Sequence, residues 1–63
     1  MSPAEFRIAL KGAGLTQRRL SRILDCDKAT VLRWAQGEVP VPVAVQLLLT
    51  AWTRYPRLIA GYD

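Results

Sequence analysis

The residue types best suited to contact a ligand lie close together between Asp27 and Trp34, in the segment DKATVLRW. If this segment is a helix, Val31 and Trp34 lie on its hidden side, and its outward side carries Lys28, Ala29, Leu32 and Arg33. The outward side therefore combines two cationic hydrogen-bond donors with two aliphatic tips. Such a mixture is neither an ordinary solvated surface nor a core face. It suits recognition of a partner that offers both acceptors and apolar groups.

The same inventory excludes most catalytic and metal-binding chemistry. The chain has no histidine, one cysteine and five scattered acidic residues. These residues supply no nucleophile paired with a base and no cluster of metal ligands. We therefore expect neither an enzyme nor a bound metal or cofactor. Cys26 is expected to be a small buried apolar residue, with a reactive thiol as the alternative.

The length of the chain predicts one domain that gains stability from a partner. The domain spans 1–63, and a chain this short buries only about 60% of the surface that its unfolded form exposes. A single cysteine permits no internal disulfide, so self-association or a ligand is expected instead. The unpaired cysteine and the lack of a secretory segment indicate a cytoplasmic protein. No membrane partner is expected, because the apolar run from Val43 to Leu49 is too short to cross a bilayer.

Positive charge is concentrated in the first half of the chain. The net charge is +4, and seven cations lie between Arg7 and Arg33, against only Asp25 and Asp27. From Gly37 onward, cations and acids balance. This asymmetry favours a polyanionic partner for the first half.

Helix signals divide the chain into short helical segments. Ser2 and Glu5 form a capping box, Thr16 and Asp27 are N-cap residues, and Gly37 is a C-terminal cap. No strand alternation is present, and the prolines near residue 41 forbid a ladder there. We therefore predict an all-α fold of four to five short helices, over about 3–11, 17–24, 28–36 and 42–54, with a final turn at 57–60.

The segment Leu15 to Gly37, LTQRRLSRILDCDKATVLRWAQG, resembles the DNA-binding domain of Cro and phage-repressor type regulators, the XRE-like family. The residues that match the family pattern are Thr16, Gln17, Leu20, Leu24, Thr30, Val31, Trp34 and Gly37. Two positions depart from the pattern. Ser21 replaces a small alanine where two helices cross, and Asp25 replaces a glycine in a turn that needs positive φ.

The resemblance implies a lambda-repressor-like helix-turn-helix over about 16–37, whose second helix enters the major groove of double-stranded DNA. It then implies base contacts from Lys28, Ala29, Leu32 and Arg33. Phosphate contacts are expected from Thr16, Gln17, Arg18, Arg22 and Gln36, since the free N–H groups at a helix start favour phosphate. An alternative remains, in which Leu32 belongs to a protein interface and Lys28 and Arg33 are ordinary solvated charges.

The helix over 42–54 is too apolar for a single packing role. Its apolar residues span about 200° of the circumference, about twice the arc that a core-facing side needs. The excess predicts a dimer interface in the C-terminal region, 42–63, formed by Val45, Leu49, Trp52, Leu58, Ile59 and Tyr62. The alternative is that the C-terminal segment folds back and covers this patch itself.

Together these features predict a sequence-specific DNA-binding transcriptional regulator. We expect a homodimeric repressor or autorepressor that recognises an inverted-repeat operator, with no small-molecule ligand evident. Short proteins of this kind resemble phage and mobile-element autorepressors, including regulators encoded beside anti-CRISPR genes. The alternative is an antitoxin-like or adaptor protein that binds another protein through its apolar C-terminal helices.

Overall fold

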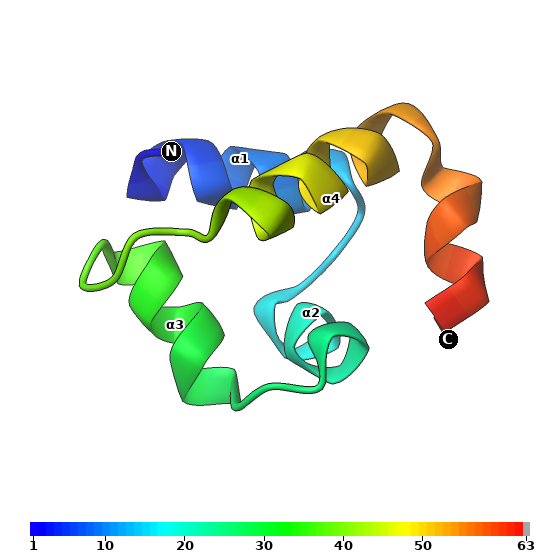
Figure 1. Cartoon of the computed structure of the whole chain (residues 1–63). Helices are drawn as coiled ribbons and strands as arrows, with labels where there is room; N and C mark the ends of the chain where they lie inside the picture. The colour runs from blue at the N-terminus through cyan, green and yellow to red at the C-terminus, as the bar shows by residue number, and fades with distance from the viewer. Residues whose placement is uncertain (63) are drawn as a thin grey trace.

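The computed structural model describes the backbone of residues 1–62 and the side chains of residues 1–61, and within this range it contains five helices and no strand. The helices are α1 (Pro3–Gly12), α2 (Gln17–Leu24), α3 (Lys28–Gln36), α4 (Val43–Arg54) and the 3-10 helix η1 (Pro56–Tyr62). The all-α class is therefore confirmed. In Figure 1, α1 and α4 lie side by side above α2 and α3, and η1 lies at the end of the molecule away from α3.

The ends of α1 follow directly from the local sequence. The Ser2 hydroxyl accepts a hydrogen bond from the Glu5 backbone N–H at 3.1 Å, and the Glu5 carboxylate accepts one from the Ser2 N–H at 2.9 Å. These two bonds confirm the predicted capping box. The pKa of Glu5 is lowered, first because the Ser2 backbone N–H donates a hydrogen bond to the charged carboxylate, and second because the Ser2 side chain also stabilises it.

Backbone geometry joins α2 to α3 through a tight turn. Asp25 adopts the left-handed conformation, with φ 53° and ψ 47°, as expected for a residue at a glycine position. Ser21 is buried, and its hydroxyl donates to the Arg18 carbonyl at 2.7 Å, so it fills the predicted close crossing. Asp27 occupies the N-cap position of α3, but its side chain makes no capping hydrogen bond. The predicted start of α3 is therefore correct. The predicted capping hydrogen bond from the Asp27 side chain is not formed.

One hydrophobic core joins all five helices. The side chains that are almost completely buried are Trp52, Phe6, Leu20, Leu49 and Val31, which come from α4, α1, α2 and α3. Ile59 of η1 completes the cluster. The rings of Phe6 and Trp34 meet edge to face, with centroids 6.1 Å apart and planes at 81°, which fixes α3 against α1.

The predicted dimer interface is wrong for four of its six residues. Val45, Leu49, Trp52 and Ile59 are buried within the chain itself, with exposed fractions of 7% or less. They are buried because α4 turns its 45–49–52 side toward α1 and because η1 packs back on α4. Leu58 is half exposed, and the side chain of Tyr62 lies outside the described residues. The alternative, in which the C-terminal segment covers the apolar residues, is therefore correct for this part of the patch.

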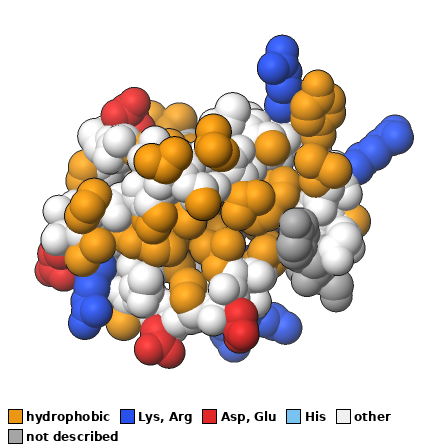
Figure 2. All heavy atoms as spheres, in the orientation of Figure 1, with side chains coloured by type: hydrophobic (Ala, Val, Ile, Leu, Met, Phe, Trp, Pro, Cys, Tyr) orange, Lys and Arg blue, Asp and Glu red, His pale blue; other side chains and the backbone are white. Residues whose placement is uncertain are grey.

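The excess apolar surface of α4 lies on the other side of the helix. Val43 is 70% exposed and Leu47 is 66% exposed, and Tyr55 and Leu58 follow at 58% and 50%. Figure 2 shows hydrophobic side chains across the face that α4 occupies, with lysine and arginine side chains projecting from the edges. Among the described residues, no helix is long and apolar enough to span a membrane.

Two leucines of α4 test this orientation directly. Leu49→Ala removes a side chain with 0% exposure, so we expect it to lower the free energy of unfolding by about 2–5 kcal/mol. Leu47→Ala is the matched control, because Leu47 is 66% exposed, and we expect a change within about 0.5 kcal/mol. Urea denaturation followed by circular dichroism measures both. Similar losses in the two variants would contradict the assigned core face.

Two glycines with positive φ test the contact between the start of α1 and the end of α3. Gly14 (φ 71°) has open space where a Cβ would lie, whereas a Cβ on Gly37 (φ 80°) would lie 2.7 Å from Cγ of Pro3. Gly14→Ala should therefore cost only the left-handed strain, about 1 kcal/mol. Gly37→Ala should cost more, about 2–3 kcal/mol, because the rigid proline ring cannot move away alone. Equal losses of unfolding free energy would show that Pro3 does not press on Gly37.

Candidate nucleic-acid interface

Helix α3 is divided sharply into an outward and an inward side. Val31, Trp34 and Ala35 are buried, with exposed fractions of 0%, 6% and 2%. The residues predicted to contact bases, Lys28, Ala29, Leu32 and Arg33, are all exposed. Leu32 is 44% exposed. We call these four residues the α3 outer face.

Three contacts from α1 hold α3 in place behind this face. Phe6 packs edge to face on Trp34, and Nη1 of Arg7 donates a hydrogen bond to the Ala35 carbonyl at 3.1 Å. The third contact joins Pro3 to the backbone at Gly37, which has no room for a Cβ there. All three lie in the C-terminal part of α3. The α3 outer face is therefore presented by a helix whose position is determined by α1.

The start of α2 supplies a second group of candidate contacts. The Thr16 hydroxyl accepts a hydrogen bond from the Arg19 N–H at 3.1 Å, which organises the first turn. Gln17 is half-buried, and Arg18 is exposed beside it. The unpaired N–H groups and the positive end of the helix dipole at this position attract anions. The helix that carries these groups, α2, packs directly on α3.

The two remaining phosphate-contact candidates lie at the far ends of their helices. Arg22 is exposed in the last turn of α2, and Gln36 is exposed as the last residue of α3. In a nine-residue helix, Gln36 lies about 12 Å along the axis from Lys28. A ligand that contacts both residues must therefore be extended.

The turn between α2 and α3 carries opposite charge and a thiol. Asp25 and Asp27 are exposed on either side of Cys26, which is half-buried against the core. Burial raises the pKa of the Cys26 thiol, and the negative charges of Asp27 and Asp25 raise it further. A raised pKa disfavours the thiolate form, and Cys26 packs against the hydrophobic core.

One residue near this site has a role that sequence reasoning missed. Arg7 counts among the cations of the first half, yet its guanidinium reaches a backbone carbonyl of α3. No local signal identifies the partner of Arg7, since 28 residues separate the two groups.

Comparisons with protein-family models, with curated proteins and with solved structures return no match for this chain.

The left-handed turn that positions α3 predicts a stabilising substitution. Asp25→Gly removes the steric cost of a Cβ at φ 53° and should raise the free energy of unfolding by up to about 1 kcal/mol. Asp27→Gly is the matched control, because Asp27 has a φ of −66°. That variant only adds freedom to the unfolded chain and should lower stability by about 0.5–1 kcal/mol. Thermal denaturation of both variants checks the prediction, and a destabilised Asp25→Gly protein would contradict it.

Proposed function

We propose that this protein is a sequence-specific, double-stranded-DNA-binding transcriptional regulator that acts as a repressor or autorepressor. In this proposal, α2, its three-residue turn and α3 form a helix-turn-helix, and α3 lies in the major groove. The observation that carries the proposal is the division of α3. Two cations and two aliphatic side chains are exposed on one side, while the opposite side is packed in the core.

Each residue of the α3 outer face has a suitable target on base edges. The Lys28 ammonium and the Arg33 guanidinium donate to guanine O6 and N7, and a well-placed bidentate pair contributes about 1–3 kcal/mol of discrimination. Ala29 and Leu32 contact the methyl group of thymine. The proposal therefore also explains why a leucine with 44% exposure stands between two cations.

Contacts with the DNA backbone set the position of α3 on the duplex. Gln17 and Arg18 at the start of α2 bind phosphate together with the free backbone N–H groups. Thr16, Arg22 and Gln36 provide further phosphate contacts. These contacts contribute affinity that is insensitive to sequence and falls with salt.

The proposed active form is a homodimer in the cytoplasm. A second copy covers the exposed apolar side chains of α4 and η1, which are Val43, Leu47, Tyr55 and Leu58. Two copies of α3 would then lie about 34 Å apart and fit an inverted-repeat operator. A bound dimer represses a promoter simply by occupying it.

A second candidate is a protein-binding module, and one observation favours it. The segment from Val43 to Leu58 contains no acidic residue. Its exposed apolar side chains suit an amphipathic protein partner as well as a second copy. In an antitoxin-like or adaptor protein, this surface would bind the partner, and DNA binding would be weak and independent of sequence.

Selection of bound duplexes from random DNA, followed by gel shifts, tests the proposal. We expect one preferred sequence with two symmetric half-sites. On that duplex, Lys28→Ala or Arg33→Ala should reduce binding about 5- to 100-fold and remove the preference over a scrambled duplex. Arg18→Ala should weaken binding to both duplexes equally and lower the slope of log K against log[salt] by about one.

Arg57→Ala is the control for charge alone, because Arg57 is an exposed cation on η1, at the far end from α3. It should leave the sequence preference unchanged. If no duplex is preferred, or if Arg57→Ala keeps its self-association and still has the same effect as Arg33→Ala, the α3 outer face does not read sequence.

A further inference from the structure

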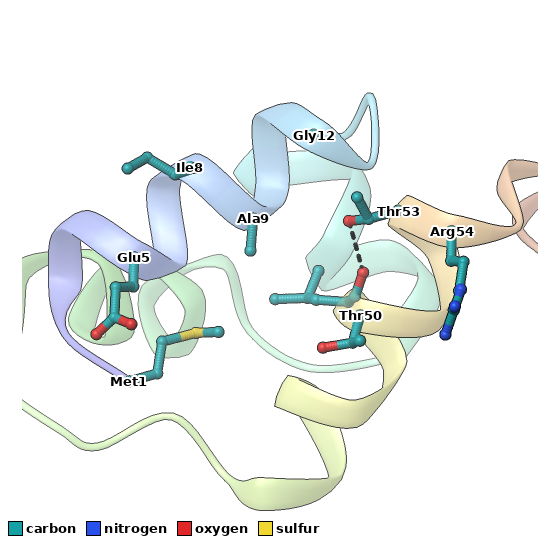
Figure 3. A pocket seen from close by; sticks show the side chains of 9 residues that line it. Met1, Glu5, Ile8, Ala9, Gly12, Thr50, Thr53 and Arg54 are labelled. Carbon is teal, nitrogen blue, oxygen red and sulfur yellow. Dashed lines mark hydrogen bonds between the residues drawn. The ribbon is translucent and has the colours of Figure 1, made fainter.

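A groove of about 690 Å³ lies between α1 and α4, apart from the proposed DNA-binding surface. Figure 3 shows its lining, in which Glu5, Ile8, Ala9 and Gly12 come from α1 and Thr50, Thr53 and Arg54 come from α4; Ala9 points toward α4, and Ile8 points outward. Pro3 and Arg7 make two of the three contacts of α1 with α3 described above. At about 100° per residue, Glu5, Ile8 and Gly12 lie on the opposite side of α1 from these two. The groove therefore faces away from α3.

Apart from the buried Leu49, the floor of the groove is made of small side chains. A Cβ on Gly12 would lie 3.4 Å from Cγ2 of Thr53, so α1 and α4 approach closely there. The hydroxyls of Thr50 and Thr53 donate to the Gln46 and Leu49 carbonyls at 2.9 and 2.8 Å. Their donors are thus used within α4, and the floor requires no polar ligand.

A large apolar side chain stands beside this shallow floor. Ile8 is 71% exposed, the highest value among the large hydrophobic residues of the described chain, and Met1 beside it is 42% exposed. A protruding isoleucine next to a floor of glycine, alanine and threonine is a surface that can complement itself.

The charges at the two ends of the groove also complement each other. Glu5 lies at one end and Arg54 at the other (Figure 3). A hydrogen bond from the Ser2 backbone N–H to Oε1, at 2.9 Å, keeps the Glu5 carboxylate in place. When one copy is turned end for end against another, each Glu5 comes opposite the arginine of the other. The whole chain carries +4 and copies repel one another, but the lining of the groove holds one acid and one base.

We propose that this groove binds a second copy of the chain in an antiparallel, two-fold arrangement. Ile8 of each copy lies over the Ala9–Gly12 floor of the other, and Glu5 pairs with Arg54 of the partner subunit. This contact adjoins the α4–η1 surface of the proposed operator dimer, because Arg54 lies beside Tyr55 and Leu58. It joins molecules back to back, with the two α3 outer faces pointing apart.

Back-to-back contact has a consequence that rests on the proposed function. Two copies of the chain joined through the groove present two α3 outer faces. They can therefore hold two duplexes, or two sites on one DNA, at the same time. The association itself does not depend on DNA.

Ile8→Glu tests the association in the absence of DNA. Ile8 is exposed, so the variant keeps its fold by circular dichroism, but it places an acid on the apolar floor of the partner. We expect at least a tenfold weaker self-association by sedimentation equilibrium. Val39→Glu is the matched control, an exposed apolar residue of the connector before α4, and should leave association unchanged. An unchanged association constant for Ile8→Glu overturns the proposal.

A charge-reversal pair tests the arrangement of the two copies. Glu5→Arg and Arg54→Glu should each weaken association, and the double variant should restore it to within about threefold of the original protein. Loss of the capping box in Glu5→Arg cannot produce this rescue, because the double variant lacks the box as well. Failure of the double variant to recover overturns the antiparallel pairing.

The DNA consequence has its own measurement. Two differently labelled copies of the selected duplex should be recovered together with the original protein but not with Ile8→Glu, which should still bind one duplex normally. If Ile8→Glu lowers self-association but no duplex is preferred by either protein, the groove contact stands and the proposed function falls. If both duplexes are recovered together with Ile8→Glu to the same extent as with the original protein, the groove does not bridge DNA.

Discussion

The attachment of α3 to α1 is the constraint on which the rest of the structure depends. An edge-to-face aromatic pair, one guanidinium bond to a carbonyl and a close approach of Pro3 to a glycine backbone all act on the C-terminal part of α3. These contacts lie on the buried side of α3. The side chains on the opposite side of the helix are exposed and do not pack in the core. In so small a domain, a helix held this firmly can present exposed side chains in a reproducible geometry. Any recognition by α3 requires that geometry.

The distribution of apolar residues then explains the shape of the remainder. One side of α4 closes the core, and η1 folds back so that Ile59 joins it. This leaves two apolar surfaces, the exposed side of α4 and the groove beside α1. They lie on different elements from the basic surface of α2 and α3. Most of the exposed apolar side chains therefore lie on other elements than the basic side chains of α2 and α3.

Features governed by neighbouring residues were predictable from sequence, and features governed by distant packing were not. The capping box at Ser2, the left-handed Asp25 and the closing Gly37 each depend on a few consecutive residues. The exposure of the α3 outer face follows from helical periodicity alone. The orientation of α4 does not, because its apolar residues cover more than one side and only the positions of α1 and η1 decide which is buried. The Arg7 contact and the groove at Gly12 depend on the same long-range arrangement and leave no pattern in the sequence.

The separation of the two sides of α3 also bears on how such a protein changes over generations. Lys28, Ala29, Leu32 and Arg33 contribute almost nothing to the core, so exchanging them leaves the fold nearly intact. Val31 and Trp34 allow no comparable variation, since a smaller side chain at either position opens a void. Substitutions at these four exposed positions therefore change the surface chemistry of α3 while other residues maintain thermodynamic stability. Under the proposed function, duplicated copies of the gene diverge quickly in specificity by this route.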